Sequence, residues 1–283
     1  MKAMKNTDDT YCGACLHKAV AEDRRKTLRV SVLLAWLTVF AALLTSAGTS
    51  AQTHWQLGVG TTHILDTYLS QEKFHGTGLA LLTTSERCRD SARWSAQWQH
   101  QLHLSTADDR AGNASLIEAM YKLFYGRYRS IGLTPRLQLQ AGAMAGIGLG
   151  AIYNTRNGNN PVQARAGLHV MPSVKATYRF SILKKEARLR YQLDLPLAGL
   201  VFSPNYGQSY YEMFTLGNYD HNIVPVTFVA APSFRQQLAL LFRAGRKITV
   251  SMGYLGDYHQ LKVNNLKQHV YDHTLMVGIM KNI

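Results

Sequence analysis

Three polar residues near the C-terminal end of the chain have the side-chain types of an acid–base site or a metal site. His259 follows Asp257 by two residues, and Asp272 lies on the next predicted segment. A histidine beside carboxylates can act as a general base, and the same groups are zinc ligands. No serine or threonine stands at a convincing spacing beside them, so we expect a hydrogen-bonded polar cluster. The catalytic alternative stays open, and Asp66 would join the cluster if the first and last segments lie side by side.

A second candidate site is the segment 203–222, which is dense in Tyr, Asn and Gly. Ser209, Asp220 and His221 have the types of a nucleophile, an acid and a base, but adjacent Asp and His residues cannot easily orient one another. The composition favours an ordered loop with Asx turns and buried tyrosines. We predict that this loop contacts a ligand or partner through Asn205, Tyr206, Ser209, Tyr210, Tyr211, Asn218, Asp220 and His221.

The elements that must position these residues are predicted by an alternation of apolar and polar side chains from Val162 to Val201. An alternation of period two indicates a strand with one dry face and one wet face. Strands of soluble sheets usually have roughly 5–6 residues, whereas a strand that crosses a membrane needs roughly 9–11. The segments on either side of Leu183–Glu186 therefore predict a hairpin of a transmembrane β-barrel.

Similar alternation recurs from Trp55 onward, and no run after Ala51 is apolar enough for a helix in lipid. The pattern predicts an all-β fold, an antiparallel up-and-down transmembrane barrel of about ten strands. The proline in Ala231-Pro232-Ser233 lacks a ladder donor, so an interruption there would raise the count to twelve. We expect long connections at one end of the barrel, in residues 105–113, 154–161, 202–222 and 261–267.

The first 51 residues predict a leader that precedes a single barrel domain, residues 52–283. The apolar run 30–44 follows four basic residues between Arg24 and Arg29 and precedes a stretch of small residues, which is typical of a secretory signal peptide. The run is shorter than the roughly 20 residues of a membrane-spanning helix, and we expect cleavage after Ala51. The CxxC pair Cys12 and Cys15 falls in the leader, and we predict neither a metal nor a cofactor.

The formal net charge of the whole chain is +14. The strand register points a set of cations into the barrel, with only Glu118 and Asp194 as evident partners. A barrel of this size is mostly filled by its own side chains, so we predict a basic, plugged lumen. A narrow channel that favours anions is the alternative. Because the charge is not gathered on one outer surface, nucleic acid is excluded as a partner. The predicted lumen cations are Arg136, Lys175, Arg179, Arg188, Arg190 and Arg235, together with Lys122.

Three short segments carry a resemblance to a known family: residues 65–70 (LDTYLS), 206–212 (YGQSYYE) and 216–222 (LGNYDHN). They resemble an uncharacterised family of outer-membrane β-barrels that is common in Bacteroidetes. The resemblance implies an outer-membrane barrel and no established activity, so no catalytic residue is carried over. We therefore expect a monomeric barrel with a structural or surface-interaction role, in contact with outer-membrane lipid and with a surface glycan or protein. A lipid-modifying hydrolase at the barrel rim is the enzymatic alternative.

Overall fold

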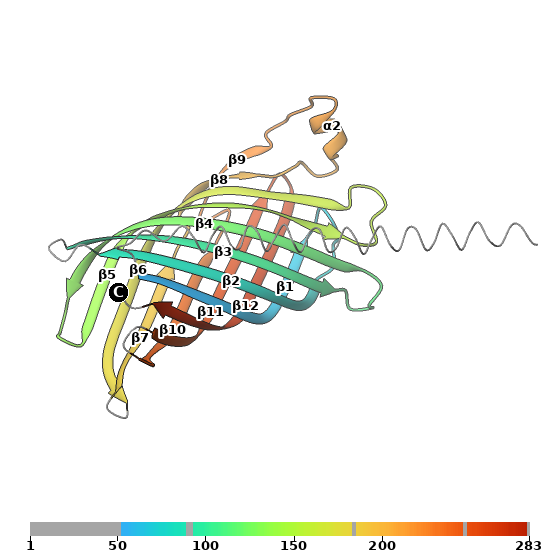
Figure 1. Ribbon diagram of the computed structural model, residues 1–283. Helices are drawn as coiled ribbons and strands as arrows, with labels where there is room; N and C mark the ends of the chain where they lie inside the picture. The colour runs from blue at the N-terminus through green and yellow to red at the C-terminus, as the bar shows by residue number, and fades with distance from the viewer. Residues whose placement is uncertain (1–51, 89–92, 183–184, 246–247, 282–283) are drawn as a thin grey trace, which may run out of the picture. The chain divides into compact units, whose positions relative to one another are not determined.

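A computed structural model describes residues 52–88, 93–182, 185–245 and 248–281 (Figure 1). The predicted leader, with Cys12 and Cys15, lies outside the described residues. No helix within the described ranges is long and apolar enough to cross a membrane.

The described chain forms one antiparallel sheet that closes on itself through the pairing of β5 with β6. Ten of its twelve strands, all but β8 and β9, make up the barrel wall. The prediction of an antiparallel up-and-down transmembrane barrel of about ten strands is therefore confirmed. The strands are β1 (Gln52–Asp66), β2 (Phe74–Cys88), β3 (Trp94–Asp108), β4 (Ser115–Gly132), β5 (Leu137–Asn154), β6 (Val162–Ile182), β7 (Lys185–Asp194), β8 (Ala198–Phe202), β9 (Ile223–Thr227), β10 (Phe234–Arg243), β11 (Ile248–Val263) and β12 (Leu266–Lys281).

The wall is apolar on its outside and polar on its inside. Leu57, Val59, Leu275 and Val277 on the paired strands β1 and β12 are 57–70% exposed. Inward-facing glutamines on β3, such as Gln99, are buried. This is the reverse of a soluble protein, and it is the pattern of a barrel whose outer surface meets lipid.

Prolines interrupt two of the expected strands. The strand predicted to reach Val201 breaks at Pro196, so β7 ends at Asp194 and β8 begins at Ala198. The next strand breaks around Pro232, which separates β9 from β10. Proline has no N–H to donate to a ladder, and the two broken pieces pair with each other as the β8–β9 hairpin. The interruption expected at Pro232 is present, but it adds a hairpin and leaves the wall at ten strands.

One predicted connection is wrong. The expected long turn at 261–267 is a two-residue turn, Asn264-Asn265, between β11 and β12. Both residues have positive φ, 51° and 60°. Asparagine tolerates this left-handed conformation, and two such residues form the tight turn whose twist suits a hairpin.

Candidate functional site

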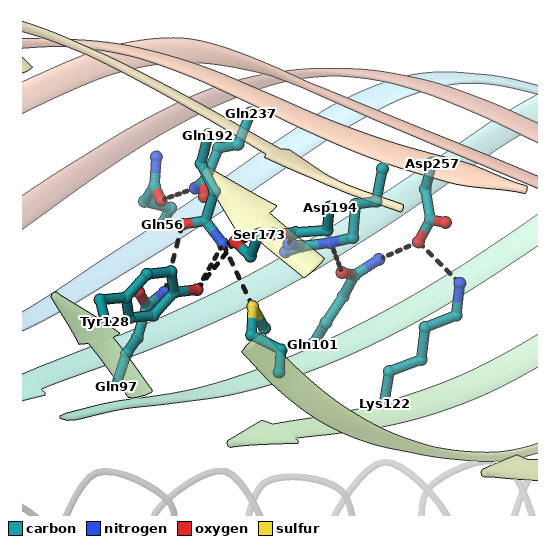
Figure 2. A network of polar contacts seen from close by, with 12 residues as sticks. Gln56, Gln97, Gln101, Lys122, Tyr128, Ser173, Gln192, Asp194, Gln237 and Asp257 are labelled. Carbon is teal, nitrogen blue, oxygen red and sulfur yellow. Dashed lines mark hydrogen bonds and ion pairs between the residues drawn. The ribbon is translucent and has the colours of Figure 1, made fainter. Parts of the chain in front are cut away.

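A network of buried polar side chains crosses the lumen and is called the plug here (Figure 2). Its residues are Gln56, Gln97, Gln101, Lys122, Tyr128, Ser173, Gln192, Asp194, Arg235, Gln237 and Asp257. Asp257 on β11 accepts hydrogen bonds from Lys122 on β4 (2.6 Å) and from Gln101 on β3 (2.9 Å). In the sheet order β4 and β11 are separated by β3, β2, β1 and β12, so this contact joins opposite walls.

The centre of the plug is the carboxylate of Asp194, which is 1% exposed. It accepts from Arg235 Nη1 at 2.9 Å, from Gln192 at 2.9 Å and from the hydroxyl of Ser173. Arg235 also donates through Nε to Gln101 at 3.0 Å. The hydroxyl of Tyr128 lies 2.9 Å from that of Ser173 and carries the network toward β4.

Further ion pairs extend along the lumen. Glu86 pairs with Lys175 at 3.1 Å and with Arg190 at 3.3 Å. Glu118 pairs with Arg165. Buried charges require such partners because an unpaired charge in the interior is costly.

The prediction of a basic lumen needs correction, because the interior is nearly balanced in charge. Arg136 and Arg179 are exposed at the end of the barrel opposite the long loop, beyond the buried part of the lumen. Arg188 lies near that end beside Glu186, at 3.5 Å. The remaining interior cations, Lys122, Arg165, Lys175, Arg190 and Arg235, face six carboxylates: Asp66, Glu86, Glu118, Asp194, Asp257 and Asp272.

On the long-loop side of the plug lies a cavity of about 90 Å³. Lys122, Arg235 and Asp257 bound it toward the plug. Its other walls mix apolar and polar side chains, among them Met120, Phe124, Met171, Val201, Leu261, Val263, Gln163, Arg165, His169 and His259.

The structure brings two of the three predicted acid–base residues to this cavity, inside the barrel and below its rim. Asp257 and His259 both line it, whereas Asp272 accepts from Thr62 at 2.7 Å and does not. Asp66 lines the same cavity and accepts from Gln268 at 2.5 Å.

These groups do not form a nucleophile–base pair. His259 has a buried Nδ1 without a hydrogen-bond partner. The two serines of the cavity, Ser203 and Ser233, donate to the backbone oxygens of Pro204 and Gln260. Among the described residues the cavity therefore has no serine activated by His259.

A metal-like cluster that the sequence analysis missed lies beside the plug. His103 Nδ1 is 3.5 Å from Glu118 and 3.6 Å from Asp272, and all three side chains are buried. The donor types suit zinc, but Arg165 and Thr62 already occupy the two carboxylates. An arginine on one carboxylate and a hydroxyl donor on the other fit a network of ion pairs and hydrogen bonds better than a metal centre. The three residues come from β3, β4 and β12, so only the closed barrel brings them together.

Residues 203–222 are called the lid here. They contain the short helix α2 (Tyr210–Phe214), and Figure 1 shows α2 at the tip of the β8–β9 hairpin. The hydroxyl of Ser209 accepts from the N–H of Glu212, and the Glu212 carboxylate accepts from the N–H of Ser209. These hydrogen bonds lower the pKa of Glu212. Ser209 is thus a helix cap, and the spacing S-x-x-E in the sequence was the signal for it.

The lid is tied to several connections and strands of the barrel. Tyr68, in the β1–β2 connection, donates to Gln208 O at 3.0 Å. Tyr210 donates to Gln163 on β6 at 3.1 Å and accepts from the N–H of Ala164 at 2.7 Å. Burial raises the pKa of Tyr68 to about 12 and raises that of Tyr210 as well. Two of the segments that carried the family resemblance, 65–70 and 206–212, therefore meet in space.

The opposite side of the lid is open to solvent. Tyr206, Tyr211, Phe214 and Tyr219 are 63–66% exposed. Asp220 and His221 form an exposed ion pair close to them in sequence. Of the residues predicted for this loop, Asn205 and Asn218 serve the lid itself, because the Asn205 amide donates to Asp220 O and the Asn218 carbonyl accepts from Gln208.

Replacing Tyr210 with phenylalanine is expected to loosen the lid. The change leaves the Ala164 N–H and the Gln163 side chain without their partner, at a cost of about 1 kcal/mol. That corresponds to a roughly five-fold larger open population, which limited proteolysis of membrane-embedded protein would report as faster cleavage within residues 203–222. Tyr211→Phe, at an exposed ring, is the matched control and should be cleaved at the wild-type rate.

The chain is similar to several solved outer-membrane proteins. The chain is similar to the outer-membrane protease OmpT from Escherichia coli, with 7% identity, a TM-score of 0.45, and coverage of 84% of this chain and 99% of that one. It is similar to the translocator domain of the autotransporter NalP from Neisseria meningitidis, with 12% identity, a TM-score of 0.39, and coverage of 92% and 98%. It is also similar to an outer-membrane channel from Pseudomonas putida F1, with 9% identity, a TM-score of 0.42, and coverage of 83% and 96%.

At these identities and TM-scores the similarities say nothing about substrate or activity. None of the curated proteins matches the chain.

A family model matches residues 31–283, which is most of the chain. The predicted membership of an uncharacterised family is confirmed, while the match does not test the expected origin in Bacteroidetes. The chain belongs to the family described as protein of unknown function (DUF3316).

Proposed function

We propose that the protein is a monomeric, exported outer-membrane barrel that presents its lid to the cell exterior as a carbohydrate-binding surface. The observation that carries this proposal is a set of exposed aromatic rings on a lid that several hydrogen bonds fix to the barrel. The barrel itself acts as a closed anchor.

The apolar outer face of the wall supports the membrane location. The lid is by far the longest of the described connections, and long connections of outer-membrane barrels face the exterior. In this orientation Tyr206, Tyr211 and Tyr219 would face the cell exterior.

Aromatic rings suit sugars because a flat apolar ring can cover the C–H face of a pyranose while polar neighbours bind its hydroxyls. Tyrosine supplies this area with few rotatable bonds. Asp220 and His221 are the polar neighbours. A surface that is already ordered loses little entropy on binding.

The two alternatives receive less support. The plug joins opposite walls of the barrel, which disfavours a channel for anions. His259 has no serine partner among the described residues, which disfavours a hydrolase.

The test is binding of the protein, embedded in fluorescent nanodiscs, to a printed array of bacterial and host glycans. Wild type should retain at least one glycan class. The triple variant Tyr206→Ala, Tyr211→Ala, Tyr219→Ala should bind it on the order of tenfold more weakly, because interface aromatics carry much of a binding energy.

Tyr178→Ala, which removes an exposed ring near the end of β6 opposite the lid, is the matched control and should bind like wild type. The proposal is wrong if wild type retains no glycan or if the triple variant binds as wild type does.

A further inference from the structure

Beyond the ends of β7 and β10 the β8–β9 hairpin continues the sheet beside β6, and no strand ladder among the described residues joins β9 to β11. This stretch between β9 and β11 is called the seam here. Among the described strands β9 pairs only with β8, and β11 pairs with β10 only as far as Tyr258. Isolated hydrogen bonds to the segment before β10 cross the seam on either side of Leu261, where Lys262 N–H donates to Ala230 O at 3.0 Å and Gln260 N–H donates to the Ser233 hydroxyl at 3.0 Å. Above it, the Asn264 amide donates to Ser203 O at 3.1 Å.

Proline accounts for the seam. Four of the chain's seven prolines lie between residues 196 and 232. Pro196 and Pro232 end the strands that would have continued the wall, and Pro225 lies inside β9, where it has no N–H to offer a neighbour. Lipid-facing backbone groups are normally all paired, so a segment built this way is an exception within the wall.

Apolar side chains fill the seam. Val201, Val226, Ala231 and Leu261 form a buried cluster, with Val224 and Val263 packed against it. Parting this packing would break the isolated hydrogen bonds at Gln260 and Lys262 but no strand ladder. The residues just outside are apolar as well, with Val229 92% exposed and Phe228 42% exposed.

The cavity lies directly behind the seam, because Val201, Leu261 and Val263 belong to both. Its volume of about 90 Å³ is several times the roughly 15 Å³ that one water needs. Met120, Phe124 and Met171 add apolar, adaptable walls on the far side.

Two polar atoms of the cavity residues have no partner. His259 Nδ1 and Arg235 Nη2 are both buried and unpaired. Arg235 is 3% exposed, and its other two nitrogens are used by Asp194 and Gln101. A buried donor left unpaired is costly, so an oxygen atom that accepts from Arg235 and His259 would complete the site.

We propose that this cavity binds the acyl chain of a membrane amphiphile that enters from the bilayer through the seam. The chain occupies the apolar walls, and its carbonyl or carboxylate oxygen accepts hydrogen bonds from Arg235 Nη2 and His259. Fatty acids and monoacyl phospholipids share this chemistry. The lid closes the exterior side, since Phe202 and Ser203 line the cavity at the base of the lid.

Binding of the fluorescent fatty acid parinarate to the protein in nanodiscs tests the proposal, with palmitate and lysophosphatidylethanolamine as competitors. Wild type should bind the probe saturably. The stronger competitor shows whether the bound acyl chain belongs to a fatty acid or to a monoacyl phospholipid. Gly148→Leu places a side chain into the cavity, where the nearest contact of a new Cβ is the flexible end of Met120 at 2.8 Å. This variant should weaken binding at least tenfold.

Gly132→Leu, at a glycine with open space around it, is the matched control and should bind as wild type does.

A second variant tests the entry route through the seam and does not depend on Gly148. Val226→Cys with Leu261→Cys, in a chain whose Cys12, Cys15 and Cys88 are alanine, is bridged with a short thiol-cleavable cross-linker. Probe uptake should slow at least tenfold when bridged and recover on reduction. Absence of saturable binding in wild type, or uptake unchanged by both Gly148→Leu and the bridge, would overturn the proposal.

Discussion

Replacing Asp194 with alanine is expected to lower the free energy of unfolding by about 3–5 kcal/mol, because removing one partner of a buried ion pair leaves the other charge uncompensated. Arg235 would remain 3% exposed without its carboxylate. Ser173 and Gln192 would lose the same acceptor. Urea titration of the barrel in lipid vesicles, followed by the heat-modifiable gel shift, measures the loss.

Two variants show whether the loss comes from buried charge. Asp194→Asn keeps the shape of the side chain but removes the charge, so it should fall between wild type and Asp194→Ala. Glu186→Ala removes the pairs of this exposed carboxylate with Arg243 at 3.4 Å and Arg188 at 3.5 Å, and should cost no more than about 1 kcal/mol. Equal losses in Asp194→Ala and Glu186→Ala would contradict the buried network.

Removing the neutral side chains of the plug is expected to turn a closed barrel into a conducting one. Gln97, Tyr128 and Gln192 contact one another across the lumen, with Gln97 donating to Gln192 at 3.3 Å. Their replacement by alanine leaves the ion pair of Asp194 with Arg235 and that of Glu86 with Lys175 in place. Polar walls would then surround a water-filled gap beside these ion pairs. Planar bilayer recordings of the triple variant should show discrete conductance steps.

The control for this variant removes similar volume from the lipid-facing side. Trp98→Ala with Tyr125→Ala deletes two rings that contact each other at 4.5 Å on the outer face of β3 and β4. This double variant should remain silent. If it conducts as the plug variant does, the conductance reports general loosening of the wall and the role assigned to the plug is wrong.

The strands were predictable because alternation is a local property of the sequence. Every inward or outward assignment within Val162–Phe180 follows from a period of two, and the closed barrel preserves it. The strand break at Pro232 was also predictable from the sequence. The sequence did not indicate that the broken pieces would form a separate hairpin. Whether a broken strand ends the wall or forms a hairpin depends on which neighbour pairs with β8, and the sequence contains no local signal for that.

The charge balance could not be predicted in the same way. Register shows that Lys122 and Asp257 face inward, but their 2.6 Å contact requires β4 and β11 to stand on opposite sides of a closed barrel. The same holds for Lys175 on β6 and Glu86 on β2. A count of inward cations on neighbouring strands therefore overestimates the net charge of the lumen.

The lid was predicted as an ordered loop, and the sequence also contains a local signal for the helix within it. Ser209 and Glu212 have the spacing of a capping box, which would have indicated α2 and excluded Ser209 as a nucleophile. The anchor from Tyr68 to Gln208 joins residues far apart in the sequence and could not be foreseen. The cavity likewise could not be foreseen, since its walls come from β1, β4, β5, β6, β8, β10, β11 and β12.

The plug joins opposite walls of the lumen, so the wild-type barrel should not conduct ions. Single-channel recording of the wild-type protein in planar bilayers tests this most directly. We predict that wild-type protein, shown to be folded by its heat-modifiable gel shift, produces no conductance steps in the membrane where the plug variant produces them. Discrete ohmic steps from the folded wild type would contradict the account.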